Sequence, residues 1–356
     1  MTAPTVLSVD VMGGDKGPAP VIAGLARVAA TEPDLRFILH GNAAEVTRLV
    51  SRRRRLRDRV EIRHADGVVA MDEKPSRALR SGRGTSLWQC LECVSSGEAN
   101  TAVSSGNTGA IVAMAMLVLR KAPKVDRPAI AVHWPARNTN GFNVVLDMGA
   151  DIRADANNLI QYAVMGAEYA RLAASVQTPR VGLLNVGSED TKGHQDLRQA
   201  KAALTVLAAD PATGLSFSGF VEGTDIPSDC VDVVVTDGFT GNIAMKASEG
   251  TAGFIRTALK EAFTHSVLSR FGALFAMGSL RRLRMRIDPR RANGGIFLGL
   301  NGNVVKSHGG ADAVGHASAI SLAAKIAAND LAALVSERLA DLDVPEARKS
   351  LPAAHK

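Results

Sequence analysis

The sequence contains few aromatic residues, few cysteines and no long apolar segment. Phe, Tyr and Trp account for 4% of the 356 residues, although 46% of the residues are hydrophobic. A core with so few rings must be filled by Ala, Val, Leu and Ile, which is typical of parallel strands covered by helices. The longest apolar run, 110–119, is well short of the roughly 20 residues that cross a bilayer. No basic segment precedes the first strand-like residues, so we expect no secretory signal.

The three cysteines, Cys90, Cys93 and Cys230, are too few for a disulfide framework. We therefore expect the protein to function in the reducing environment of the cytoplasm. Cys90-Leu-Glu-Cys93 has a spacing found in zinc and redox sites, but no second pair of ligands accompanies it. We interpret both residues as ordinary helix residues, with zinc or redox chemistry as the alternative.

Signatures of common cofactor and nucleophile chemistry are also missing. The sequence has neither a Walker pattern nor a Gly-x-Gly-x-x-Gly motif after a strand. It has no Gly-x-Ser-x-Gly elbow, and no cysteine lies in a helix-opening anionic turn, so a covalent acyl-enzyme is not favoured. Asp10, Asp15 and Asp237 could form a metal site, but they come from separate turns without local ligand spacing. We expect neither a cofactor nor a metal.

Positive charge is concentrated in two arginine clusters. The formal net charge is +7, and residues 52–59 and 281–291 contain six arginines each. Such runs are usually solvated helix faces, but two dense clusters also indicate a surface that attracts polyanions. The candidates are nucleic acid, anionic lipid and an acidic protein. Nucleic acid is the weakest of them, because no zinc-finger or RNA-binding aromatic motif is present.

Short apolar segments alternate with helix-like segments through most of the chain, which predicts an α/β fold with a mostly parallel sheet. We predict a single catalytic domain over 1–335 and a partly disordered C-terminal tail over 336–356. A helical hairpin at about 251–291 is inserted in the domain, with an interruption at 269–272 and an apolar bend at 273–277. The predicted strands are 5–9, 36–40, 60–64, 101–104, 129–134, 143–147, 180–185, 215–220, 231–236 and a segment around 295–300.

Four of the predicted strands end in a polar, glycine-containing turn that leads to a helix. The carboxyl ends of strands in an open α/β sheet converge on a crevice, so we expect the turns to share one site. Glycine-rich turns that open helices bind anions through backbone N–H groups. The candidate binding residues in these turns are Asp10, Gly13, Gly14, Asp15, Ser105, Gly106, Asn107, Thr108, Asp237, Gly238, Thr240 and Gly241.

Two further positions can supply charge or hydrogen bonds to such a ligand. Lys192 follows a strand and can neutralise an anionic substrate or stabilise an oxyanion, and the amide of Asn242 can donate to the same oxygen. Lys306 and His308 lie among glycines before a predicted helix. They could hold a phosphate and polarise a carbonyl, or they could be a solvated lysine and part of a helix cap.

These motifs, in this order, resemble the bacterial phosphate acyltransferase family of phospholipid synthesis. After Arg80 the family usually has a lysine-rich stretch, whereas this chain has Ser81-Gly-Arg-Gly-Thr-Ser86. The matching segments are Val9-Asp-Val-Met-Gly-Gly-Asp15, Met71-Asp-Glu-Lys-Pro-Ser-Arg-Ala-Leu-Arg80, Ser104-Ser-Gly-Asn-Thr-Gly-Ala110, Val181-Gly-Leu-Leu-Asn-Val-Gly187, Val233-Val-Val-Thr-Asp-Gly-Phe-Thr-Gly-Asn242, and Gly299-Leu-Asn-Gly302 with Lys306-Ser-His-Gly309.

The resemblance implies a three-layer α/β/α enzyme, similar in fold to phosphate acetyltransferases and isocitrate dehydrogenases, that works as a homodimer. It implies transfer of a long-chain acyl group from an acyl carrier protein thioester to inorganic phosphate. The acyl phosphate would then serve glycerolipid synthesis, with a glycerol-3-phosphate acyltransferase as a downstream partner. We hypothesise that Ser105, Asn107 and Thr108 hold phosphate, while Lys192 and Asn242 orient it and stabilise the oxyanion.

The resemblance also implies peripheral association with the inner face of the plasma membrane. The hairpin is then a candidate contact for carrier protein or membrane, with a dimer-interface helix pair as the alternative. A coenzyme A-dependent short-chain phosphate acyltransferase and a non-catalytic anion-binding regulator or lipid-bound scaffold remain rival readings of the whole chain. The hairpin residues that we expect to make the contact are Leu274, Phe275, Met277, Arg281, Arg282, Arg284 and Arg286.

Overall fold

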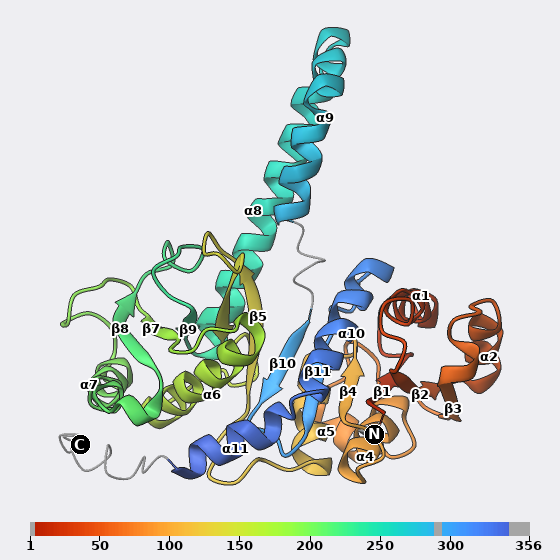
Figure 1. Cartoon of the computed structure of the whole chain (residues 1–356), viewed down its shortest axis with the longest axis horizontal. Helices are drawn as coiled ribbons and strands as arrows, with labels where there is room; N and C mark the ends of the chain where they lie inside the picture. Colours follow the sequence, from red (N-terminus) through yellow and green to blue (C-terminus); the bar gives the residue numbers. More distant parts are fainter. Residues whose placement is uncertain (1–3, 288–293, 342–356) are drawn as a thin grey trace.

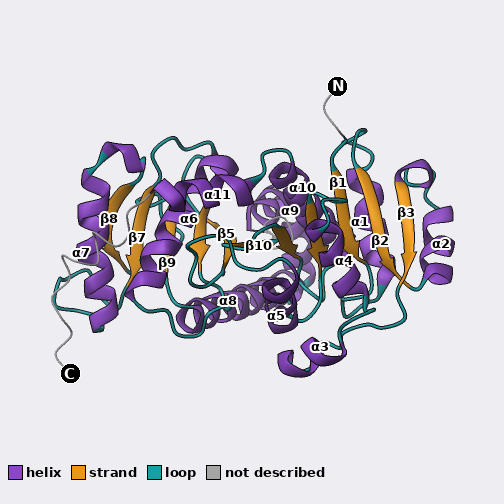
Figure 2. Ribbon diagram, turned by 90° about the horizontal axis from the view of Figure 1, so that it is seen from below, coloured by secondary structure: helices purple, strands orange, loops and turns teal. Residues whose placement is uncertain are grey.

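The computed structural model describes residues 4–287 and 294–341, with side chains described up to residue 282 in the first range. These residues form one eleven-stranded sheet with helices on both faces (Figures 1 and 2). The strands are β1 (Val6–Asp10), β2 (Arg36–Gly41), β3 (Val60–His64), β4 (Thr101–Ser104), β5 (Ala129–Pro135), β6 (Phe142–Leu146), β7 (Arg180–Leu184), β8 (Ser216–Val221), β9 (Val233–Val235), β10 (Gly295–Leu298) and β11 (Asn303–Lys306).

Most helices connect one strand to the next. The α-helices are α1 (Pro18–Val28), α2 (Ala43–Ser51), α3 (Pro75–Ser81), α4 (Ser86–Ser95), α5 (Thr108–Val118), α6 (Ala156–Ala174), α7 (Gln195–Ala209), α8 (Gly238–Thr264), α9 (Val267–Ile287), α10 (Ala313–Ala327) and α11 (Leu331–Asp341), and the short 3₁₀ helices are η1 (Arg57–Arg59) and η2 (Pro211–Thr213). Within the described ranges no single helix is long and apolar enough to cross a bilayer, although the bent pair of α10 and α11 meets that test when taken together.

The sheet order is β3-β2-β1-β4-β11-β10-β5-β6-β9-β7-β8. Strand β10 runs antiparallel to both of its neighbours, and β5 runs antiparallel to β6. All other neighbouring pairs are parallel, which confirms the predicted mostly parallel α/β sheet. The antiparallel pairs divide the sheet into two parallel wings, one containing β1, β4 and β11 and the other containing β6, β9 and β7.

Strand β11 was not among the predicted strands. Its four residues lie between Gly302 and the glycines at 309 and 310, a stretch in which we predicted no strand. The burial of Val304 and Val305 between β4 and β10 stabilises the strand in spite of its length. Its pairing places Lys306 beside Ser104, at the end of β4.

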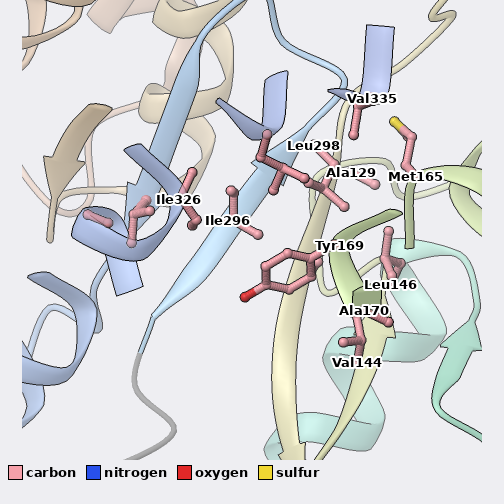
Figure 3. Close-up of a cluster of buried hydrophobic side chains, with 14 of the residues drawn as sticks. Ala129, Val144, Leu146, Met165, Tyr169, Ala170, Ile296, Leu298, Ile326 and Val335 are labelled. Atoms are coloured by element: carbon pink, nitrogen blue, oxygen red, sulfur yellow. The ribbon is translucent and has the colours of Figure 1, made fainter. Parts of the chain in front are cut away.

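Buried side chains fill the region where the two wings meet. Helix α6 is buried along most of its length and contributes Tyr162 and Tyr169, both with no exposed surface. Figure 3 shows Tyr169 packed among side chains of β10, α10 and α11, including Ile296, Ile326 and Val335. Helix α11 continues to Asp341, beyond residue 335 where we expect the tail to begin, and residues 342–356 lie outside the described ranges.

The hairpin consists of α8 and α9, which project together from the sheet (Figure 1). Two details of the sequence prediction were wrong. Helix α8 already begins at Gly238, and the break between the helices lies at 265–266 rather than at 269–277. The reason is local, because the Ser266 hydroxyl accepts a hydrogen bond from the Ser269 amide (3.0 Å) and so caps α9. The apolar residues expected at the bend lie within α9, where Phe275 is 92% exposed.

A half-buried histidine gives a testable pH dependence. His133 on β5 stacks between Phe142 and Tyr169, and burial lowers its pKa to about 4. Burial likewise lowers the pKa values of His40 and His316 to about 4. Between pH 6.5 and 4, these histidines therefore bind protons in the unfolded chain but not in the folded chain. The stability that depends on their neutral form is fully present above pH 6.5 and is lost as the pH falls towards 4.

On acidification, we expect His133→Gln to lose about 1–3 kcal/mol less of its free energy of unfolding than the wild type. The reason is that the variant lacks one histidine whose pKa is lowered by folding. The measurement is urea unfolding of the wild type and the variant at several values between pH 4.5 and 7. The comparison must be made as a difference between the two proteins, because the raised pKa of Asp147 acts in the opposite direction. The prediction would be contradicted if the free energies of unfolding of the two proteins changed with pH by the same amount.

Candidate active site

The turns that follow β1, β4 and β11 meet in one group at the ends of these strands. The Asp15 amide donates to the Gly309 carbonyl (3.0 Å), and the Ser307 amide donates to the Ser104 carbonyl (2.8 Å). Glycine is required where the turns touch, because a Cβ on Gly13 would lie 2.9 Å from the Gly106 nitrogen. The structure therefore brings together three of the segments that the sequence singled out.

Asp10 organises this group from beneath. Its carboxylate is buried and accepts a hydrogen bond from the Ser104 hydroxyl (2.7 Å), and the same hydroxyl accepts from the Gly106 amide (3.1 Å). Burial raises the pKa of Asp10, although these hydrogen bonds and those from the turn after β1 oppose the shift. Asp10 thus positions the two turns and does not itself offer a charge at the surface of the site.

Ser105 and the start of α5 form the part of this group best suited to an anion. Ser105 is 2% exposed, and its hydroxyl has no hydrogen-bond partner among the described residues. Asn107 caps α5 by accepting from the Ala110 amide (3.1 Å) and donates to the Met71 carbonyl (2.7 Å). Asn107 therefore holds the turn, while Thr108 begins the helix, whose first N–H groups have no partner within it.

Lys306 and His308 lie beside this turn. Lys306 is half-buried and donates to the Ser307 carbonyl (3.2 Å), and burial lowers its pKa while the charges of Asp15 and Glu249 oppose that shift. His308 is exposed, and its Nδ1 is assigned as the acceptor of a hydrogen bond from the Gly310 amide (3.1 Å). Lys306 therefore lies beside the turn after β4, and His308 helps to hold its own turn.

The turns after β6 and β9 meet in a second group. The Gly238 amide donates to the Asp151 carbonyl (2.8 Å), and a Cβ on Gly241 would lie 2.0 Å from the Asp147 carbonyl oxygen. Only glycine permits this approach. Asp237 caps α8 by accepting from the amide and the hydroxyl of Thr240, both at 2.8 Å. These four predicted residues therefore build the turn that presents Asn242.

Two polar side chains without a hydrogen-bond partner among the described residues follow the neighbouring strands β9 and β7, namely Asn242 and Lys192. The Asn242 side chain lies against Gly149, and within the described part of the chain its amide makes no hydrogen bond. Lys192 is exposed after β7, the strand next to β9, and its ammonium has no partner among the described residues. Asn185, which directly follows β7, is buried, and its Nδ2 has no hydrogen-bond partner among the described residues. Two unengaged donors therefore lie at the ends of neighbouring strands.

Sequence reasoning missed the turn after β6. The Asp147 carboxylate accepts from the amides of Ile130, Gly149, Ala150 and Asp151, and burial nevertheless raises its pKa to about 6. The signal was present, since an apolar run at 144–146 is followed by two aspartates and a glycine, as in the other turns. Asn185 lies in the segment 181–187, which carries part of the family resemblance, but we did not predict it as a site residue.

The hydrogen bonds and close approaches thus join the turns after β1, β4 and β11 to one another, and the turns after β6 and β9 to one another. Helix α8 links the two groups, because it begins at the second group and its Glu249 acts on Lys306 of the first. Asn242 and Glu249 are two helical turns apart, about 10 Å along the axis. Asp10 and Asp237 fall in different groups, and no set of three potential metal ligands occurs among the described residues.

Comparisons with known proteins agree with this architecture. A family model described as a fatty acid synthesis protein matches residues 5–334. A phosphate acyltransferase from Ruegeria sp. (strain TM1040) is 57% identical over 94% of this chain and 89% of that protein. One from Paracoccus denitrificans (strain Pd 1222) is 58% identical over 94% of this chain and 90% of that protein.

Solved structures share the fold at low identity. A phosphotransacetylase from Streptococcus pyogenes superposes with a TM-score of 0.58 and 19% identity, covering 91% of this chain and 94% of that one. A branched-chain phosphotransacylase from Enterococcus faecalis V583 superposes with a TM-score of 0.54 and 13% identity, covering 91% of this chain and 99% of that one. The predicted similarity to phosphate acetyltransferases is thereby confirmed at the level of the fold.

Proposed function

The chain belongs to the phosphate acyltransferase family, and on that premise we propose that it makes acyl phosphate from a long-chain acyl-[acyl carrier protein] thioester and inorganic phosphate. The observation that best supports a phosphate acceptor is the buried, unpartnered hydroxyl of Ser105 at the start of α5. A phosphate there would receive that hydroxyl and the first N–H groups of the helix, with Lys306 as the nearby cation.

The second group of turns carries the donors for the thioester. A phosphate oxygen attacks the carbonyl carbon, the carbonyl oxygen becomes an oxyanion, and collapse breaks the carbon–sulfur bond. The thiolate leaves on the carrier and takes a proton from solvent. The Lys192 ammonium and the Asn242 amide are free to stabilise the oxyanion, and no enzyme nucleophile is required.

The test is mass-spectrometric detection of acyl phosphate from purified protein, phosphate and a thioester donor. We expect product with long-chain acyl carrier protein and at least tenfold less with the matched coenzyme A thioester, since a carrier protein adds a docking surface. Preference for a short-chain coenzyme A donor would replace the proposal with the rival enzyme. Phosphate binding without turnover on any donor would contradict it.

We propose further that the protein is a homodimer in the cytoplasm, held peripherally at the inner face of the plasma membrane by the hairpin. Large apolar side chains are exposed along it, among them Leu268 near the break and Phe275 within α9. Arg281 and Arg282 are exposed towards the end of α9 and suit anionic head groups or an acidic carrier protein, while the side chains of Arg284 and Arg286 lie outside the described ranges. Acyl phosphate released there would be available to a glycerol-3-phosphate acyltransferase.

We expect Phe275→Glu to abolish co-flotation with anionic phospholipid vesicles while the mass of the dimer in solution is unchanged, because a carboxylate cannot enter the apolar layer. Light scattering after gel filtration gives the oligomeric state of the same samples. Glu261→Gln, on the exposed surface of α8, is the control for a change of charge in the hairpin. Loss of the dimer with normal flotation would instead assign the hairpin to the dimer interface.

A further inference from the structure

The loop that carries Lys192 is exposed and has little support of its own. Residues 188–192 are all exposed, and the internal backbone bond among them joins the Lys192 amide to the Glu189 carbonyl (3.0 Å). Among the described residues, the hydrogen bonds and ion pairs that reach the loop from other elements come from α7 alone. They are made by Lys201 and Arg198.

Of these two residues, Lys201 makes the stronger contact with the loop. Its ammonium forms an ion pair with Asp190 and lies 4.6 Å from the ring centroid of Phe220, so a carboxylate and an aromatic face hold the same cation. Phe220 is buried on β8 and pairs with Leu183 of β7, the strand that leads into the loop. The Lys201 side chain is 25% exposed and the Asp190 side chain is 85% exposed, so the protein shields the ammonium while solvent reaches the carboxylate.

We propose that Lys201 is a positioning residue for the reaction, which holds the loop through Asp190 so that Lys192 faces the substrate. One residue, Thr191, separates Asp190 from Lys192, so fixing the Asp190 carboxylate limits the positions that the Lys192 ammonium can reach. Arg198 adds a second anchor by donating to the Gly193 carbonyl. The inference rests on the proposed catalytic role of Lys192.

Lys201 can be altered without disturbing the packing around it. It lines a cavity of about 690 Å³ between α7 and β8, together with Thr205 and Ser216. Lys201→Met keeps the length of the stem and removes the charge. Lys201→Arg keeps the charge and the contact with the aromatic face.

We expect Lys201→Met and Asp190→Asn each to lower kcat/KM for acyl phosphate formation by about tenfold, and the double variant to lose no more than either one, because both remove the same contact. Lys201→Arg is expected to retain most of the activity. Lys325→Met, which alters a lysine on α10 that donates to the Ala173 carbonyl, is the matched control with unchanged kinetics.

A second readout does not depend on turnover. Trypsin cleaves after exposed lysines, so the rate of cleavage after Lys192 reports how firmly the loop is held. We expect this rate, followed by the mass of the fragments from the full-length protein, to rise about fivefold in Lys201→Met and Asp190→Asn and to stay unchanged in Lys325→Met.

Faster cleavage together with non-additive loss of activity supports the proposal. Unchanged cleavage overturns it whatever the kinetics, and faster cleavage with normal kinetics overturns the positioning role. If Lys192→Ala itself is fully active, the proposed role of Lys192 fails instead. The cleavage rates in the Lys201 and Asp190 variants would still decide whether the loop is anchored as described.

Discussion

We expect replacement of Lys192 or Asn242 by alanine to lower kcat for acyl phosphate formation by about 10²–10³-fold, the usual effect of removing one donor to an oxyanion. Both side chains have a donor group without a partner in the described part of the chain, and they follow neighbouring strands. Because each would bind the oxyanion more strongly than the ground-state carbonyl, the loss should fall on kcat more than on KM for the thioester.

The measurement is initial-rate kinetics with phosphate and thioester varied separately. Lys325→Ala and Asn329→Ala, at the end of α10, remove the same two functional groups away from both groups of turns and should behave as the wild type. Thermal unfolding of all four variants separates loss of chemistry from loss of fold. Near-normal turnover in both site variants would remove these residues from the mechanism.

The double variant Lys192→Ala/Asn242→Ala tests whether the two side chains bind the same oxygen. If Lys192 and Asn242 bind the same oxygen, removing the second donor after the first should cost less than it does alone, because the remaining geometry is already impaired. If Lys192 instead binds phosphate, its loss should raise KM for phosphate and combine multiplicatively with the loss of Asn242. The two outcomes assign the lysine to one substrate or the other.

The sequence predicted well those parts of the fold that depend on short stretches of chain. The apolar run at 231–236 predicted a buried strand, and β9 (Val233–Val235) is buried as expected. The glycines predicted a polar turn that opens a helix, and Gly238 begins α8 while Gly241 packs against the turn after β6. In both cases the hydrophobic pattern and glycine chemistry act within a few residues.

What the sequence did not predict depends on residues far apart in the chain. The antiparallel pairing of β10 with β5 divides the sheet into two parallel wings, and only pairing between strands that are distant in the chain determines it. The carboxylate of Asp147 is held by amides whose positions exist only after the loop has folded. The position of the break before α9 depends on whether the first helix ends near Ser266 or near the later Gly272. Local helix propensity does not distinguish between these two positions.

The second large effect that we expect is on stability rather than activity. The Glu168 carboxylate on α6 is buried and accepts from Arg171 on the same helix and from Arg338 on α11 (2.5 Å). The two guanidinium groups also donate to the carbonyls of Thr213 (3.2 Å) and Ala212 (3.0 Å). One carboxylate therefore joins α6, α11 and the segment around η2.

We expect Glu168→Ala to lower the free energy of unfolding by about 3 kcal/mol, because it leaves two partly buried guanidinium groups without a counter-charge. The value is at the lower end for broken buried pairs, since the Arg338 side chain is 31% exposed and water screens part of its charge. Chemical denaturation monitored by circular dichroism gives the measurement, and Glu168→Gln, which keeps the shape and one acceptor, should lose less.

The double variant Glu168→Ala/Arg338→Ala tests the cause of that loss. If an uncompensated charge is responsible, removing Arg338 as well should recover part of the stability that Glu168→Ala loses. If the loss comes from the cavity left by the side chain, the second truncation should add to it, because α11 then gives up its packing against α6 as well. A change below about 0.5 kcal/mol in the single variant would show that solvent already screens the cluster, and that apolar contacts such as Val335 in the core anchor α11 instead.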